Sequence, residues 1–288
     1  MQTVTDLIRL LDLKHTDTNT FLGISKTVGS PNVFGGQVLA QALNAAYRTI
    51  DNGRILNSMH AYFLEAGDLE APIAYEVQIL RDGGSFSVRR VTAIQQGKVI
   101  FILACSFHKD EKGYEHQIEM PQGVKQPEEL MSWDEMYEQY ATVLPERTKD
   151  FLSIDRPVYF KPTEIVNPMD KKDMNPSTHI WFKLKGEVTN FDLPVKQQVL
   201  TYISDYNILS VAINRHASKA HWGNTITASL DHSMWYFGDW DFDDWMLYAL
   251  DTPSTQNARG FCRGHIFTRS GKLVASVAQE GLMRPKQI

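Results

Sequence analysis

The pattern of hydrophobic and polar residues divides the chain into two halves that each begin with an apolar helix. Residues 35–50 (GGQVLAQALNAAYRTI) and 193–213 (LPVKQQVLTYISDYNILSVAI) carry apolar side chains nearly all round the predicted helix, which is typical of a buried helix. Each helix is followed by β-rich runs that are bounded by Gly, Asp and Pro. The pattern therefore predicts one long helix and then at least four antiparallel strands in each half.

The two halves also share a weak internal repeat. Residues 97–107 read GKVIFILACSF and residues 271–281 read GKLVASVAQEG, and each follows another strand-like run, so both copies predict a hairpin. In this alignment Arg89 falls opposite Arg263. A buried helix wrapped by a curled antiparallel sheet suggests an α+β hot-dog fold, and two copies in one chain suggest a double hot dog.

The repeat also suggests where the chain divides. We expect an N-terminal hot dog over residues 1–112, a connector over 113–150 and a C-terminal hot dog over 151–288. The connector is rich in Glu, Gln, Pro and Lys and predicts a short helix or two. The start of the chain, MQTVTDLIRLLDL, predicts an amphipathic helix rather than a signal peptide, because acids interrupt its apolar pattern.

Composition and charge argue against several classes of function. The net charge is -5 and no long basic run exists, so a nucleic-acid partner is not expected. The longest apolar run is too short to span a bilayer. Cys105 and Cys262 cannot build a disulfide framework or a four-cysteine zinc site, and the nine histidines form no paired metal motif. We therefore expect a cytoplasmic protein without a metal or a cofactor.

The stretch TASLDHSMWYF contains the three residue types of a hydrolase triad in a row. Neighbouring residues of a strand point to opposite faces, so Asp231 and Ser233 are expected on one face and His232 on the other. The three cannot then form a relay, and a GxSxG nucleophile elbow is absent from the sequence. His232 is interpreted as a strand residue packed near Trp235 and Tyr236.

Three other polar residues occupy apolar surroundings in the second half. Asp205 lies within the predicted helix, Ser229 is expected on the strand face of Asp231, and Gln279 lies among the apolar residues of LVASVAQEG. A buried acid is costly unless it is hydrogen-bonded, and a buried glutamine needs a partner. The residue types alone allow either three separate structural groups or one shared site.

The first half lacks this polar set. Cys105 falls opposite Gln279, and Asn44 or a neighbouring uncharged residue falls opposite Asp205. The difference fits a duplication followed by the loss of one of two sites, and it also fits drift.

Long motifs in family order resemble the acyl-CoA thioesterase II (TesB-like) family over essentially the whole chain. They include VFGGQVLAQAL (33–43), HAYFLEAGD (60–68), ILRDGGSFSVRRVTAIQ (79–95), ISDYN (203–207), SLDHSMWYF (229–237), ARGFCRG (258–264) and LVASVAQEGLMR (273–284). Members of this family use a double hot dog to hydrolyse fatty acyl-CoA to free acid and CoA. The resemblance implies an acyl-CoA substrate and a homo-oligomer, either a dimer or a tetramer.

The resemblance also implies roles for particular residues. Asp205, Ser229 and Gln279 match the family's catalytic set in place, with Asp205 as the general base that activates water. Direct attack by the carboxylate on the thioester stays open as a second mechanism. Gly35, Gly36 and Gln37 of the VFGGQ motif and His60 of the HAYFL motif are expected to bind substrate.

Two other functions remain as alternatives. A hot-dog hydratase or dehydratase would pair its acid with a histidine, whereas the motifs here place Ser and Gln beside the acid. An acyl-CoA-binding module without catalysis would not require Asp205, Ser229 and Gln279, and all three are present.

Overall fold

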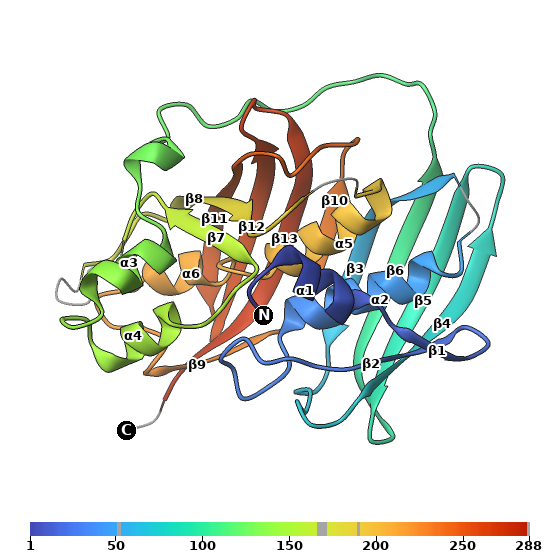
Figure 1. Ribbon diagram of the computed structural model, residues 1–288, viewed down its shortest axis with the longest axis horizontal. Coiled ribbons are helices and arrows are strands. Elements are labelled where there is room, and N and C mark those ends of the chain that lie inside the picture. Colours follow the sequence, from blue (N-terminus) through green and yellow to red (C-terminus); the bar gives the residue numbers. More distant parts are fainter. Residues whose placement is uncertain (51–52, 166–171, 189–190, 287–288) are drawn as a thin grey trace.

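The chain folds into a long antiparallel sheet that curls around its central helices (Figure 1). The computed structural model describes residues 1–50, 53–165, 172–188 and 191–286. The elements of the first half are α1 (Val4–Leu11), β1 (Lys14–Asp17), β2 (Thr20–Gly23), α2 (Gly35–Tyr47), β3 (Arg54–Phe63), β4 (Ile73–Asp82), β5 (Phe86–Gln95) and β6 (Lys98–Lys109).

The connector and the second half supply the remaining elements. The connector carries a 3-10 helix, η1 (Pro127–Glu129), and the short helix α3 (Trp133–Tyr140), followed by α4 (Glu146–Leu152). The later elements are β7 (Val158–Pro162), β8 (Ser177–Leu184), α5 (Leu193–Ser204), α6 (Ser210–Asn214), β9 (Thr225–Ser229), β10 (Asp231–Tyr236), β11 (Met246–Gln256), β12 (Arg259–Thr268) and β13 (Leu273–Pro285).

The order of equivalent strands is the same in both directions from the middle of the sheet. It runs β1-β2-β4-β5-β6-β3-β10-β13-β12-β11-β8-β7, and β9 pairs with β13 beside this path. Each half thus contributes one unit, β4-β5-β6-β3 or β10-β13-β12-β11, and the two units meet where β3 pairs with β10. Helices α2 and α5 pack on each other inside the curl, where Asn44 donates to Gln198 across 2.9 Å. The predicted double hot dog is confirmed, while its boundaries at residues 112 and 151 stay a prediction.

Helix α1 has the amphipathic character that its sequence predicts. The Thr3 hydroxyl accepts from the Asp6 backbone N–H, and the Asp6 carboxylate accepts from the Thr3 backbone N–H, which closes a capping box. Val4, Leu7 and Leu11 on the opposite side are buried in the main core. The helix therefore covers that core with its apolar face.

The second long helix is shorter than predicted. Helix α5 ends at Ser204 and Asp205 is its C-cap residue, so the acid lies at a helix end rather than within a helix. Asn207 follows in the left-handed region with φ 67°, a conformation that Asn tolerates and that commonly ends helices. The chain resumes as α6 only at Ser210.

Both predicted hairpins are present, but their turns differ by one residue. Gln95 pairs with Lys98 across two turn residues, whereas Thr268 donates to the carbonyl of Lys272 across three. An extra residue in a turn shifts the register of the strand before it.

This shift corrects the alignment of the two halves. Arg89 pairs with Cys105, and Gln279, the counterpart of Cys105, pairs with Cys262. The structural counterpart of Arg89 is therefore Cys262 and not Arg263. Arg89 accordingly points inward and is 2% exposed, whereas Arg263 points outward and binds Asp251.

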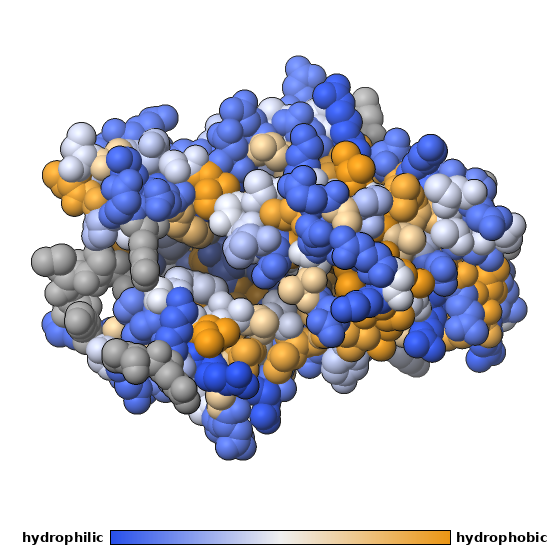
Figure 2. All heavy atoms as spheres, turned by 90° about the horizontal axis from the view of Figure 1, so that it is seen from below, coloured by the Kyte–Doolittle hydropathy of each residue, from blue (hydrophilic) through white to orange (hydrophobic). Residues whose placement is uncertain are grey.

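The surface is mixed in character. Seen from below, hydrophobic patches alternate with hydrophilic residues (Figure 2). Among the described residues, no helix combines the length and the hydropathy needed to cross a bilayer.

Candidate active site

The carboxylate of Asp205 meets the start of the helix from the other half. The backbone N–H of Gly36, in the first turn of α2, donates to Asp205 Oδ2 across 2.8 Å. Helix N-termini carry unpaired N–H groups and a partial positive charge, both of which favour an anion. A side chain at Gly35 would place its Cβ 2.8 Å from the same oxygen, so only glycine fits there without displacing the carboxylate.

Gln279 links the other two predicted site residues. Its side chain is 1% exposed and points to the inner face of β13. The amide Nε2 donates to Ser229 Oγ across 3.0 Å, and Gln279 lies near enough to Asp205 to act on the pKa of its carboxyl. The structure therefore brings Asp205, Ser229 and Gln279 into one cluster.

A bulge places Ser229 on this face. β9 and β10 pair with β13 in registers that differ by one residue, because Ser229 is opposite Gly281 but Ser233 is opposite Ala278. The extra residue between the two strands reverses the alternation of side chains. Ser229 consequently points to the same side as His232, and the expectation that it shares a face with Asp231 is wrong.

His232 belongs to the cluster, and its interpretation as a packing residue is wrong. It is fully buried, with Nδ1 2.5 Å from Gln279 Oε1 and Nε2 3.0 Å from Ser204 Oγ. Burial lowers the pKa of His232, so the ring is neutral at neutral pH. Since Gln279 Oε1 can only accept, the single ring proton lies on Nδ1. Nε2 faces the Ser204 hydroxyl, whose one proton is also within reach of the Thr201 carbonyl at 2.8 Å.

This chain of hydrogen bonds fixes the amide of Gln279. With Oε1 held by His232, the NH2 group must face Ser229 and Asp205. The sequence contained one usable signal for His232, since a histidine at an inward strand position needs partners for both ring nitrogens.

Burial governs the electrostatics of Asp205. Desolvation raises its pKa above the ordinary value, whereas His232 when it is protonated, the Gly36 N–H and Gln279 each act to lower it. The net effect is a raised pKa, which makes the carboxylate a stronger base than a solvated aspartate once it is ionised.

The corresponding positions of the first half are apolar. Met59 pairs with Cys105 on the inner face, and both side chains are buried. Met59 corresponds to His232 and Cys105 corresponds to Gln279, because β3 and β10 are equivalent strands that pair with each other where the two halves meet. The polar network therefore has no counterpart at these first-half positions.

Two of the four predicted substrate-binding residues lie beside Asp205 and two do not. Gly35 and Gly36 adjoin Asp205, as described above. Gln37 is buried and accepts from the Lys26 backbone N–H across 3.0 Å, so its side chain anchors the preceding loop. His60 lies on the outer face of β3, where its ring contacts Trp235 and its Nδ1 is 3.1 Å from Ser233 Oγ. The structure therefore places Gln37 and His60 outside the cluster, because strand alternation and helix periodicity turn them away from it.

Comparison with known proteins identifies the family. Residues 147–282 match the family model described as acyl-CoA thioesterase, and residues 25–108 match the model of the acyl-CoA thioesterase N-terminal domain. The chain is 38% identical to acyl-CoA thioesterase 2 of Haemophilus influenzae, and the match covers 97% of each chain. It is 34% identical to human acyl-coenzyme A thioesterase 8, over 96% of this chain and 88% of the human protein.

A solved structure agrees with these matches. The crystal structure of the acyl-CoA thioesterase II TesB2 from Mycobacterium marinum superposes with a TM-score of 0.78 at 31% identity and covers 98% of both chains. The resemblance inferred from the motifs is thus confirmed from one end of the chain to the other. By sequence and by fold, this chain belongs to the acyl-CoA thioesterase family.

Proposed function

We propose that the protein hydrolyses fatty acyl-CoA thioesters to free fatty acid and CoA, with Asp205, Ser229 and Gln279 as the catalytic residues. The observation that supports these roles best is the proximity of the three side chains, because Gln279 donates to Ser229 and lies beside the Asp205 carboxylate. Membership of the acyl-CoA thioesterase family supports the choice of substrate and reaction.

Asp205 would act as the general base for a water molecule. The ionised carboxylate takes one proton from the water molecule. At the same time the water oxygen attacks the thioester carbonyl carbon. The tetrahedral intermediate then collapses, the C–S bond breaks, and the CoA sulfur leaves with the electron pair. The proton passes from Asp205 to the thiolate, so that water is split between the acid and the thiol.

Ser229 and Gln279 would hold the water and the carboxylate in place. The Ser229 hydroxyl accepts from Gln279, which leaves its own proton free to bond the attacking water. Gln279 cannot rotate its amide without losing the bond from His232, so its NH2 group stays directed at the catalytic side. His232 is therefore a positioning residue in this mechanism.

The same geometry argues against the hydratase alternative. A hydratase would require a histidine with one ring nitrogen facing the substrate. Both nitrogens of His232 are occupied, one by Gln279 and one by Ser204. Direct attack by Asp205, which would form an anhydride, uses the same residues and remains the second mechanism.

Assembly and location are also proposals. Large side chains on the outer face of the sheet, including Tyr62 and Trp235, are substantially exposed and support a homo-oligomeric dimer or tetramer that covers them. We place the protein in the cytoplasm, on the basis of its two buried free cysteines.

The proposed reaction can be tested with the purified protein and decanoyl-CoA. Thiol release should be followed with a thiol-reactive dye, and decanoic acid should be identified by mass spectrometry in equal amount. A protein that binds decanoyl-CoA but releases no thiol would favour the binding-module alternative. Hydration of an enoyl-CoA without thiol release would favour a hydratase.

A further inference from the structure

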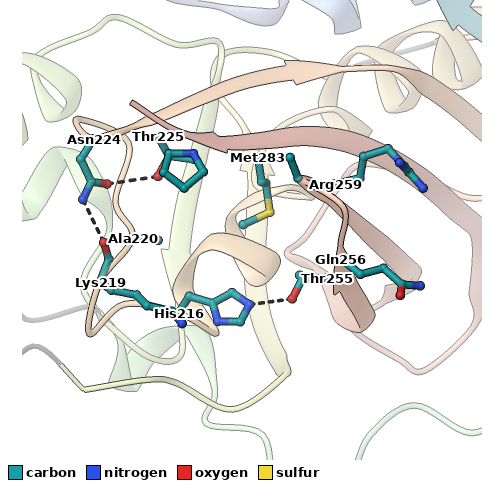
Figure 3. Close-up of a pocket in the computed structure, with 11 residues that line it drawn as sticks. His216, Lys219, Ala220, Asn224, Thr225, Thr255, Gln256, Arg259 and Met283 are labelled. Atoms are coloured by element: carbon teal, nitrogen blue, oxygen red, sulfur yellow. Dashed lines mark hydrogen bonds between the residues drawn. The ribbon is translucent and has the colours of Figure 1, made fainter. Parts of the chain in front are cut away.

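The inner sheet face that carries the proposed active site also borders a cavity. A cavity of about 530 Å³ opens between β9, the end of β13, the β11–β12 hairpin and the segment after α6 (Figure 3). Its walls include Met283 and Pro285 of β13 and Thr225 of β9. None of these groups takes part in the chemistry described above.

The cavity is connected to the site by a row of paired residues. Ser229 is opposite Gly281, Thr227 is opposite Met283, and Thr225 is opposite Pro285. Each step of two residues along a strand advances about 7 Å, so the cavity begins about 7 Å from Ser229 and extends to about 14 Å. Thr227 and Ser229 are both partly exposed, which leaves this row accessible from solvent.

The cavity has a basic rim. His216, Lys219 and Arg259 line it, and none of the described residues around it is acidic. The Arg259 side chain points to the outer face of the sheet, where its Nε pairs with Glu280 at 2.8 Å, so Arg259 adds no free charge to the cavity (Figure 3). Lys219 makes no ion pair within the part of the chain that the structure describes. His216 is bound to Thr255 Oγ1 across 2.6 Å, so Lys219 supplies the free positive charge beside an otherwise largely apolar cavity. This arrangement suits a ligand that joins an anionic group to a larger flat or apolar body.

We propose that this cavity binds the phosphate-bearing nucleotide end of CoA, with the pantetheine arm lying along β9 toward Ser229. This assignment rests on the proposed thioesterase function. The extended pantetheine arm spans a distance comparable to that between the cavity and the site. The acyl chain has no charge to match the basic rim, so we assign the nucleotide end and not the acyl end to this cavity.

The test compares two substrates that share a thioester. Decanoyl-CoA carries the nucleotide and decanoyl-pantetheine does not. In a Lys219→Glu variant, KM for decanoyl-CoA should rise about ten-fold with kcat unchanged, and both parameters for decanoyl-pantetheine should stay at parent values. The matched control is Lys98→Glu, which reverses an exposed charge in the β5–β6 hairpin.

The outcomes separate the two proposals. Equal KM increases for both esters would assign the cavity to the acyl arm, and unchanged KM for both would remove it from substrate binding. Binding of adenosine 3′,5′-diphosphate is measured in parallel by calorimetry and should weaken in Lys219→Glu but not in Lys98→Glu. This binding result holds even if the parent proves inactive, so failure of the thioesterase proposal would not conceal failure of the cavity assignment.

Discussion

The backbone N–H of Gly36 lies 2.8 Å from Oδ2 of Asp205, although the two residues are 169 positions apart. One half of the molecule thus supplies the carboxylate and the other half supplies the helix end that holds it. The site depends on the contact between α2 and α5, and neither half contains it alone.

Burial of this carboxylate should cost stability. The pKa of Asp205 is raised above its unfolded value, so the folded state binds more protons, and stability falls as the pH rises from about 4. Asp205→Asn keeps an oxygen for the Gly36 N–H and removes the charge. The variant should melt at a higher temperature than the parent at pH 7, by about 3 °C per kcal/mol relieved, and the difference should vanish below pH 4.

Differential scanning calorimetry at pH 7 and at acid pH measures this effect. Asp110→Asn, which neutralises an exposed carboxylate, is the matched control and should leave the melting temperature nearly unchanged. A lower melting temperature for Asp205→Asn at pH 7 would show that the ionised carboxylate stabilises the fold.

The raised pKa should also appear in the reaction rate. Since only the ionised carboxylate can accept a proton, kcat/KM should fall on the acid side, with a midpoint above the ordinary aspartate value of about 4. The pKa of His232 is lowered, so no second inflection near pH 6.5 should come from that ring. A pH series on decanoyl-CoA, with folding checked by circular dichroism at each pH, decides between these shapes.

The orientation of Gln279 should depend on one nitrogen of His232. In His232→Asn the amide nitrogen can replace Nδ1 and still donate to Gln279, whereas in His232→Gln it can replace only Nε2 and its contact with Ser204. The Asn variant should keep kcat within a few-fold of the parent. The Gln variant should lose about ten- to 100-fold in kcat with KM little changed, because the amide of Gln279 is free to turn over.

Equal losses in the two variants would mean that His232 acts through packing alone. Stopped-flow kinetics on both variants, together with their melting temperatures, separates these cases. The positioning role predicts different values of kcat at similar stability.

Activity should require a glycine at position 35, at the start of α2. In Gly35→Ala the new Cβ would lie 2.8 Å from Asp205 Oδ2 and 3.0 Å from the Phe63 ring, so the carboxylate must move. A displacement of this size should lower kcat by about 100-fold. Gly84→Ala is the control, because a Cβ at Gly84 has no neighbour within 4 Å. An unchanged kcat in Gly35→Ala would show that the carboxylate tolerates the shift.

Much of the fold could be predicted because it depends on repeated local patterns. Apolar helices, alternating strands and the Gly-Lys turns recur in both halves, and the site residues were detectable as polar groups in apolar places. Ser229, His232 and Asp231 show the limit of this reasoning. Strand alternation predicts their faces only when the register is continuous, and a one-residue bulge has no distinct composition.

The end of α5 shows a second limit. Periodicity continues through Asp205 to residue 213, so the pattern alone predicts one helix. The break depends on Asn207 adopting a left-handed conformation, which Asn permits but does not require. Tertiary contact with α2 at Gly36 helps to hold Asp205 at the helix end, and this contact is not visible in the local sequence.

The central claim is that Asp205 is the base, and single-turnover hydrolysis of decanoyl-CoA by Asp205→Asn tests it most directly. Asparagine preserves size and the bond from Gly36 but cannot accept a proton from water. The account predicts a rate at least 100-fold below that of the parent, in a variant that folds and binds decanoyl-CoA normally. A folded variant that hydrolyses decanoyl-CoA at the parent rate would contradict it and would place the base elsewhere.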